Sequence, residues 1–227
     1  MSISAEERPS DSPYVENIMH GWTTGAGITP RPSEVHWHMC FVRAKGQTLP
    51  LIVGPLTTAG IASWGGEAEI LWIKFKLGTF MPHLPARNFL DVETRLPEGA
   101  GQSFWLKDAV WQLPTYENAD TFVDQLVRSG VLERDPLVNA ALGDQLQAEA
   151  IASRTMRHRF LRSTGLTQNH IRQFERAQQA AALLTQGVSI LDTVYELGYF
   201  DQPHLTKSLK RFLGKTPAQQ IARLESA

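Results

Sequence analysis

Cationic and amide side chains gather in the C-terminal third of this 227-residue sequence, at a spacing that places them on helix surfaces. Between residues 201 and 214, apolar residues recur at helical intervals and leave the polar residues on the opposite face. These outward residues are Gln202, His204, Thr206, Lys207 and Lys210. A helix expected over residues 153–163 directs a second group outward or sideways: Arg154, Arg157, His158 and Arg159. Such side chains hydrogen-bond to base edges and phosphates, which is the chemistry of a nucleic-acid surface.

Charge is divided unequally along the chain. The whole sequence has a net charge of -1, but residues 1–153 contain 11 Lys and Arg against 18 Asp and Glu. Residues 154–227 contain 11 Lys and Arg against 5 Asp and Glu. A basic module joined to an acidic one is typical of a nucleic-acid-binding domain attached to a domain with another task. On charge alone, a basic face that is merely solvated is the alternative.

One other cluster could do chemistry, namely His36-Trp37-His38. Two histidines at i and i+2 share a face of a strand, as in metal-binding cupins, and Glu34 or His83 could supply a third ligand. No Glu follows His38 at the spacing of the cupin enzymes, and no catalytic base is evident. We therefore expect these histidines to be structural or to line a pocket, with no metal and no cofactor.

The N-terminal half is expected to be a small β domain. Strands are predicted over residues 36–42, 49–53 and 70–77, the last with apolar residues at every second position. Turn signals separate the apolar runs at Gly46, Gly54-Pro55 and Gly65-Gly66. Short strands at this spacing predict a barrel or sandwich. A helix over residues 117–129 could pack on this domain or form a two-fold dimer contact, and we expect the former. The single cysteine, Cys40, lies in an apolar stretch that predicts a buried, unreactive thiol.

From residue 117 onward the apolar period is helical and no strand is predicted. A weak internal repeat with an offset of 49 residues matches Arg162 with Arg211, Gly165 with Gly214, and Thr167 with Thr216. A repeat of this length indicates a duplicated unit, and each copy is predicted to be helix, turn, helix.

The second copy carries the clearer local signals. The expected helix N-caps are Ser189, Asp201 and Thr216, and the expected turn or stop residues are Gly198 and Gly214. Between the copies, a helix from Thr167 to near Gly187 would be about 28 Å long. That length is close to the ~34 Å between successive major-groove segments on one side of B-DNA.

Residues 150–224 resemble the AraC/XylS DNA-binding domain. The resemblance rests on the following linked pieces: Arg176, Ala180, Leu183 and Leu184; Ser189-Ile190; Leu197-Gly198-Tyr199-Phe200-Asp201-Gln202-Pro203-His204-Leu205; and Lys210-Arg211-Phe212-Leu213-Gly214-Lys215-Thr216-Pro217. It implies base-reading positions at Arg154, Arg157 and His158 in the first unit, and at Gln202, Pro203, His204, Thr206 and Lys207 in the second. By the same resemblance, Lys210, Arg162 and Arg211 would hold phosphates.

The sequence departs from the family in the first unit. No glycine occupies its turn, where Glu149-Ala150 stands, and Ala152 replaces the usual capping Ser. The preceding helix has few apolar residues, chiefly Leu142 and Leu146. The first unit is therefore expected to be less specific than the second, or to need support from the N-terminal domain.

These observations together predict an α+β protein with three parts. They are a flexible tail at residues 1–13, a cupin-like sensor or dimerisation domain at residues 14–134 that ends in a helix, and an AraC-type DNA-binding domain at residues 135–227. No secretion signal or membrane span is evident, which predicts a cytoplasmic protein.

The function expected from this organisation is sequence-specific regulation of transcription without enzymatic activity. Its partners would be double-stranded operator DNA, with RNA polymerase, a small-molecule effector and a second copy of the chain as further possibilities. Two other hypotheses stay open at this point. One is a cupin-type metal-dependent enzyme, and the other is an adaptor that binds protein through its helices.

Overall fold

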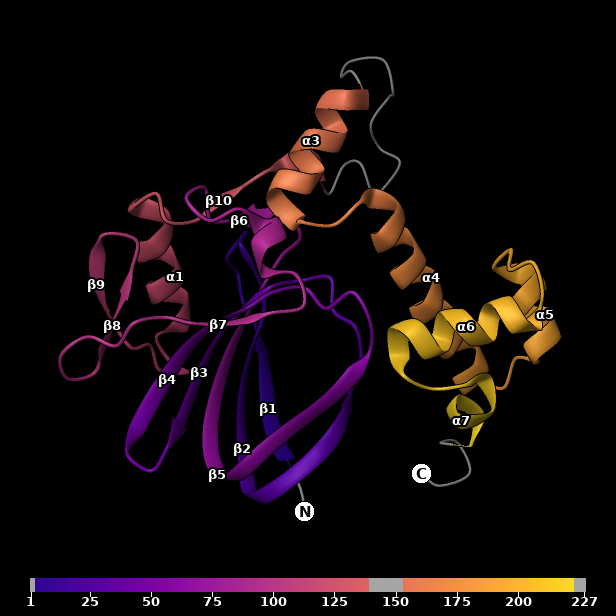
Figure 1. Ribbon diagram of the computed structural model, residues 1–227, viewed down its shortest axis with the longest axis horizontal. Coiled ribbons are helices and arrows are strands. Elements are labelled where there is room, and N and C mark those ends of the chain that lie inside the picture. The colour runs from indigo at the N-terminus through magenta and orange to yellow at the C-terminus, as the bar shows by residue number, and fades with distance from the viewer. Residues whose placement is uncertain (1–2, 139–152, 223–227) are drawn as a thin grey trace. The chain divides into compact units, whose positions relative to one another are not determined.

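The computed structural model describes residues 3–138 and 153–222. The chain divides into two compact units. Unit 1 comprises residues 1–28, 36–55 and 63–167, and unit 2 comprises residues 29–35, 56–62 and 168–227. The fold is α+β, with an antiparallel sheet in the N-terminal half and helices in the C-terminal part, as predicted (Figure 1).

The main sheet has six strands and is open (Figure 1). In spatial order they are β1 (Ile3–Pro9), β2 (Val15–Arg31), β5 (Gly60–Phe75), β3 (His38–Ala44), β4 (Gln47–Val53) and β7 (Glu93–Arg95). A closed barrel requires the first and last strands to pair. Here β7 has only three residues, which pair with Leu51 to Val53 of β4, and β1 is the opposite edge. The expected barrel is therefore not formed.

Alternation along β5 explains its place in the sheet. Leu71, Ile73 and Phe75 point to the buried face, where Leu71 pairs with Phe41 and Ile73 with Met39 of β3. The strand begins earlier than predicted, and Gly65 and Gly66 lie inside it rather than in a turn. Neither glycine has a positive φ, so the pair continues the extended backbone.

Two strands near the N-terminus differ from the sequence expectation. Residues 3–9, expected within a flexible tail, form β1 and pair antiparallel with β2 from Ile3↔Thr23 to Pro9↔Asn17. The 17-residue β2 itself was not predicted. Its Gly- and Thr-rich second half lacks the apolar alternation by which a strand is recognised.

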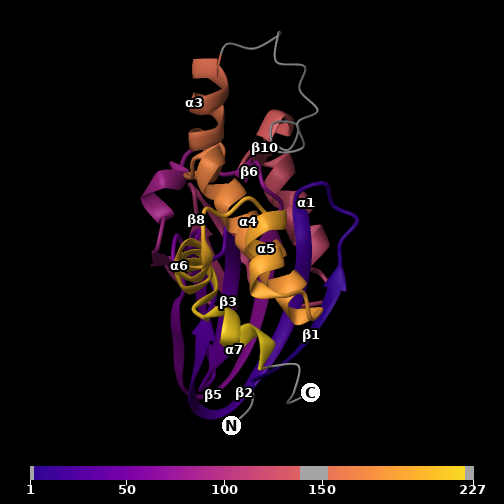
Figure 2. The same cartoon turned by 90° about the vertical axis from the view of Figure 1, so that its right-hand side faces the viewer.

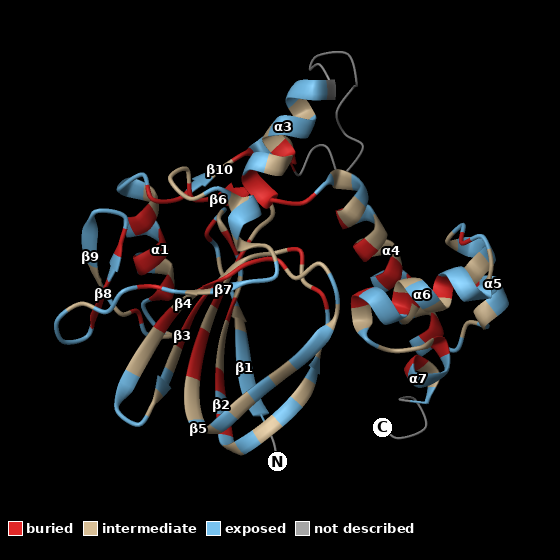
Figure 3. Ribbon diagram, viewed as in Figure 1, coloured by how far each residue is buried: buried red, intermediate tan, exposed pale blue. Residues whose placement is uncertain are grey.

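The core of unit 1 lies between the sheet and α1 (Ala119–Arg128), and Figure 3 shows buried residues on both. Phe41 of β3 meets Phe122 of α1 at 6.0 Å and Phe104 at 5.6 Å, both edge-to-face. Phe104 belongs to the hairpin of β8 (Ser103–Leu106) and β9 (Ala109–Gln112). The predicted packing of the 117–129 helix on the β domain is thus confirmed. Cys40 is also buried, on the opposite face of the sheet.

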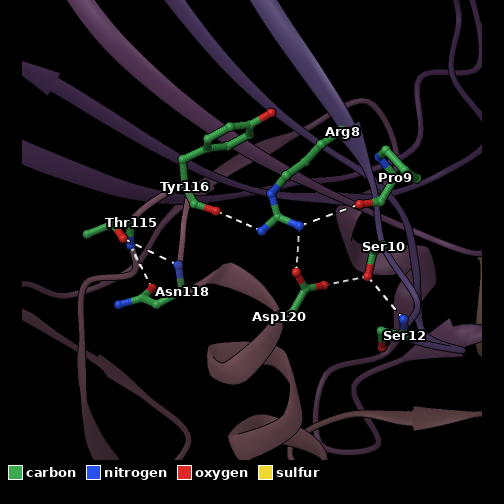
Figure 4. A network of polar contacts seen from close by, with 8 residues as sticks. All are labelled: Arg8, Pro9, Ser10, Ser12, Thr115, Tyr116, Asn118 and Asp120. Atoms are coloured by element: carbon green, nitrogen blue, oxygen red, sulfur yellow. Dashed lines mark hydrogen bonds and ion pairs between the residues drawn. The ribbon is translucent and has the colours of Figure 1, made fainter.

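A polar network ties β1 to α1 (Figure 4). The Arg8 guanidinium donates to Asp120 at 2.6 Å and to the Tyr116 carbonyl at 2.7 Å, and the Ser10 hydroxyl donates to Asp120 at 2.5 Å. Partial burial acts to raise the pKa of Asp120, but the bonds from Ser10 and Arg8 outweigh it and leave that pKa below its ordinary value. The edge strand is therefore held by side chains as well as by its ladder.

Helix α3 (Ser153–Thr164) belongs to unit 1. It packs on the short helix η1 (Ala86–Phe89) and on β6 (Thr79–Phe80), which pairs with β10 (Glu133–Arg134). The predictions for Leu142, Leu146, Glu149-Ala150 and Ala152 lie outside the described residues.

Unit 2 contains α4 (Gln168–Thr185), α5 (Ile190–Glu196), α6 (Gln202–Leu213) and α7 (Pro217–Ile221), which Figure 2 shows from the side. The inner face of α4 packs on α6, whose Leu205, Leu209 and Phe212 are buried as predicted. On α4 the buried residues include Ala177, Ala180 and Leu184. No helix within residues 3–138 and 153–222 is long and apolar enough to cross a membrane.

Candidate nucleic-acid interface

The turn between α5 and α6 has the local geometry that the sequence predicted. Ser189 caps α5 by accepting the Asp192 N–H at 3.1 Å, and Asp201 caps α6 by accepting the His204 N–H at 2.7 Å. Gly198 and Gly214 both adopt left-handed backbone, with φ of +66° and +70°. The two helices are therefore joined and ended by residues whose conformations the sequence specifies.

Residues of the family pattern that are distant in sequence meet in space. The Arg176 guanidinium of α4 lies 4.4 Å from the centre of the Tyr199 ring, and the Tyr199 hydroxyl is 3.2 Å from that of Ser208 on α6. Tyr199 is buried. A cation–π contact and a hydrogen bond thus fix the turn against α4 and α6.

The outer face of α6 displays the predicted side chains. Thr206 is half-buried, and the remaining predicted positions on this helix are exposed: Gln202, Pro203, His204, Lys207, Lys210 and Arg211. Most of these side chains are hydrogen-bond donors, and they lie on the outer surface of α6. The first turn of this helix is held by the Asp201 cap.

The ring of His204 is held in place. Its Nδ1 accepts the Phe200 N–H at 3.3 Å, and its ring meets Tyr199 edge-to-face at 5.2 Å. A neutral imidazole whose Nδ1 accepts carries its proton on Nε2, so the free edge of His204 is a hydrogen-bond donor. Phe200, which we did not single out from the sequence, is 90% exposed beside it.

The C-terminal end of α6 is bound by two segments from the N-terminal half of the chain that belong to unit 2. The Ser33 N–H donates to the Phe212 carbonyl at 2.7 Å, and the Ala59 N–H donates to the Arg211 carbonyl at 2.6 Å. The last carbonyls of a helix lack partners within it. Here two of them accept hydrogen bonds from Ser33 and Ala59, which lie far from α6 in the sequence. No pattern in the sequence indicates these two contacts.

Helix α3 displays Arg154, Arg157 and His158 as exposed residues. Arg159, expected to point outward or sideways, is half-buried and binds Asp135 through Nε at 2.6 Å and a terminal nitrogen at 2.8 Å. These hydrogen bonds to the Asp135 carboxylate raise the pKa of Arg159 above its ordinary value. Arg162 lies over the Phe80 ring at 5.2 Å. One face of α3 thus packs on other elements of unit 1, while the three predicted base-reading side chains are exposed.

The seven-residue helix α5 has an exposed apolar side chain and a buried polar one. Leu191 is 72% exposed, whereas Thr193 is fully buried and donates to the Ser189 carbonyl at 2.8 Å.

The histidine cluster does not have the expected strand geometry. Strand β3 begins at His38, so His36 lies before it and the two residues do not share a strand face. Across residues 3–138 and 153–222, no group of three His, Cys, Asp or Glu residues is placed to hold a metal ion.

The linking helix α4 has 18 residues, or about 27 Å at the usual rise. Its length agrees with the predicted strut. Because α3 and α6 belong to different units, their placement in neighbouring grooves remains a prediction.

Comparisons with known proteins identify the helical part of the chain. Residues 146–223 match the model of a helix-turn-helix domain. The chain is 30% identical over 88 residues to the HTH-type transcriptional regulator RipA of Corynebacterium glutamicum, which covers 39% of this chain and 27% of that protein. The matched region is thus about a quarter of the length of that relative. No solved structure matches the chain.

Proposed function

We propose that this chain, a member of the AraC family by its helix-turn-helix domain at residues 146–223, regulates transcription by reading double-stranded DNA through α3 and α6. The observation that carries the proposal is the exposed polar row on α6, supported by a capped helix start and a buried inner face. Helices that enter the major groove present such a row at their N-terminal end.

The chemistry of each side chain suggests its role. Gln202 would pair with adenine N6 and N7, and Lys207 would donate to guanine O6 or N7. The Thr206 methyl and the Pro203 ring would meet a thymine methyl, and His204 would donate from Nε2 to a base acceptor. On α3, Arg154, Arg157 and His158 would read a second box. Lys210, Arg211 and Arg162 would bind phosphates and set affinity rather than sequence.

We also propose that the N-terminal half is a sensor domain. The open six-stranded sheet and α1 share an apolar core of their own. This core supports a separate function for the N-terminal half, other than DNA binding. Control by an effector or partner, a cupin-like relationship, RNA polymerase contact, a homodimer, a cytoplasmic location and the lack of enzymatic activity all remain predictions. The domain boundaries after residues 13 and 134 also remain predictions.

The direct test is selection from random DNA duplexes by the full chain at about 0.15 M salt, near the physiological range. We expect enrichment of two boxes about one helical turn apart. A Gln202→Ala, Lys207→Ala variant should lose the box read by α6, because each good base contact contributes about 1–3 kcal/mol of discrimination.

A matched control is available on α1. Gln125 and Arg128 are exposed helix residues, so Gln125→Ala, Arg128→Ala removes the same types of group from another helix surface. This control should enrich the wild-type motif unchanged. Failure of the wild-type chain to enrich any motif, or equal losses in the α6 and α1 variants, would contradict DNA reading by α6.

A further inference from the structure

Phe200 is a large apolar side chain exposed to solvent at the start of the helix proposed to read DNA. It is 90% exposed and directly precedes Asp201, the N-cap of α6. Helices that enter the major groove contact base edges with the residues at their N-terminal end. The proposed function therefore brings the Phe200 ring close to DNA bases.

The backbone on both sides of Phe200 is fixed by hydrogen bonds. The Tyr199 N–H donates to the Val194 carbonyl at 2.9 Å, and the Phe200 N–H donates to His204 Nδ1 at 3.3 Å. Asp201 in turn accepts the His204 N–H at 2.7 Å. A contact made by the Phe200 ring therefore has to order one side chain rather than a loop, which keeps its entropic cost small.

The bond to His204 also places Phe200 beside a proposed base reader. The 3.3 Å between the Phe200 nitrogen and His204 Nδ1 is close to the ~3.4 Å between successive bases along a DNA strand. A phenyl ring donates no hydrogen bond, so it cannot pair with the polar groups of a base edge. The apolar group that the major groove displays is the C5 methyl of thymine, and Phe is among the residues that contact it.

The other exposed apolar side chains of the same helix-turn-helix unit have a different setting. Leu191 and Tyr195 of α5 are 72% and 90% exposed. Each is followed directly by an exposed acid, Asp192 and Glu196. Carboxylates beside an apolar pair repel the phosphates of a duplex. The charges thus favour Phe200, and not the α5 pair, as the apolar group that meets DNA.

We propose that Phe200 is a specificity-determining residue whose ring packs against the C5 methyl of a thymine in the box read by α6. This thymine lies one or two base pairs from the base contacted by His204. The inference rests on the proposed function and adds to it one apolar contact, beyond those proposed for Thr206 and Pro203.

The test measures the affinity of the full chain for the selected duplex and for copies in which one thymine at a time is replaced by uracil. Uracil lacks the methyl group and keeps every hydrogen-bonding group of thymine. We expect one such replacement near the His204 contact to weaken wild-type binding about fourfold, which corresponds to about 0.8 kcal/mol for one buried carbon. In Phe200→Ala the loss at that position should disappear, while losses at thymines contacted by Thr206 or Pro203 should persist.

The matched control is Tyr195→Ala, which removes an equally exposed aromatic ring from α5. It should keep the fourfold loss at the same thymine. Thermal unfolding of both variants checks that they are folded. A second readout replaces the thymine by cytosine or 5-methylcytosine, which differ by the methyl group alone. The wild-type chain should bind the methylated duplex about fourfold more tightly, and Phe200→Ala should bind the two equally.

The outcomes separate this inference from the proposed function. Selection of no motif would refute both. A selected motif with the same uracil losses in the wild-type chain and in Phe200→Ala would overturn the methyl contact alone. Weaker binding of Phe200→Ala to all duplexes, with every uracil loss unchanged, would also overturn it, because the ring would then add affinity without reading sequence.

Discussion

His204 provides the sharpest test of how α6 reads DNA, because the structure fixes which of its nitrogens faces outward. Nδ1 accepts the Phe200 N–H and the ring rests edge-on against Tyr199, so Nε2 carries the proton. We predict that Nε2 donates to the N7 atom of a purine, the acceptor that guanine and adenine both present in the major groove.

The perturbation is His204→Phe, which keeps an aromatic ring near Tyr199 and removes the donor. Because His204 is exposed, the free energy of unfolding should change by less than about 0.5 kcal/mol. The Phe200 N–H loses its acceptor, but this residue is 90% exposed and water can replace the bond. The DNA affinity should fall by about 1.4 kcal/mol, or tenfold, as for one neutral hydrogen bond.

The assay is a double-mutant cycle with the selected duplex and with duplexes in which one purine at a time is the 7-deaza analogue. At the contacted position, the analogue should weaken wild-type binding about tenfold and leave His204→Phe unaffected. Equal effects of every 7-deaza substitution on both proteins would refute the assigned tautomer and contact.

Three further predictions concern affinity and stability. Lys210→Gln should reduce the slope of log affinity against log salt by about 0.9, as expected for one lost phosphate contact, whereas Lys45→Gln in the β3–β4 turn should leave it unchanged. Phe212→Ala should destabilise unit 2 by about 3–5 kcal/mol in urea unfolding, because the side chain is 2% exposed, while Phe200→Ala should cost less than about 0.5 kcal/mol. Asp120→Asn should lower the free energy of unfolding at pH 7 by about 0.5 kcal/mol, a small value because Asp120 is 38% exposed. Since the folded pKa of Asp120 lies below its ordinary value, the wild-type advantage should be complete at neutral pH and disappear as the pH falls below about 4; an advantage that persists at pH 2 would contradict the network.

Most of the second helix-turn-helix unit could be predicted from short-range sequence signals. Ser189, Asp201 and Thr216 cap their helices as predicted, and Thr216 forms the full capping box with Gln219. Caps and left-handed glycines act over three or four residues, so the sequence alone contains the interacting groups. The same is true of the buried stripe of α6, which follows from helical period.

The N-terminal half was less predictable, since a strand needs a partner from elsewhere in the chain. The 16-residue β5 was recognised only over its apolar second half, and β2 was missed. The open edge at β7 depends on where the 93–95 segment reaches β4, which no local pattern encodes. The order of the strands in the sheet therefore could not be predicted from the sequence.

The sequence by itself determined the chemical nature of the helical surface, namely which side chains face outward on α6 and how that helix begins and ends. Only the tertiary structure decided what those elements contact. It placed Ser33 and Ala59 on the last turn of α6, Asp135 on Arg159, and Arg87 and Arg162 around one cavity. The reason is physical: helical period and caps are interactions between near neighbours, whereas a cavity or an ion pair over 24 residues exists only after packing has brought its walls together.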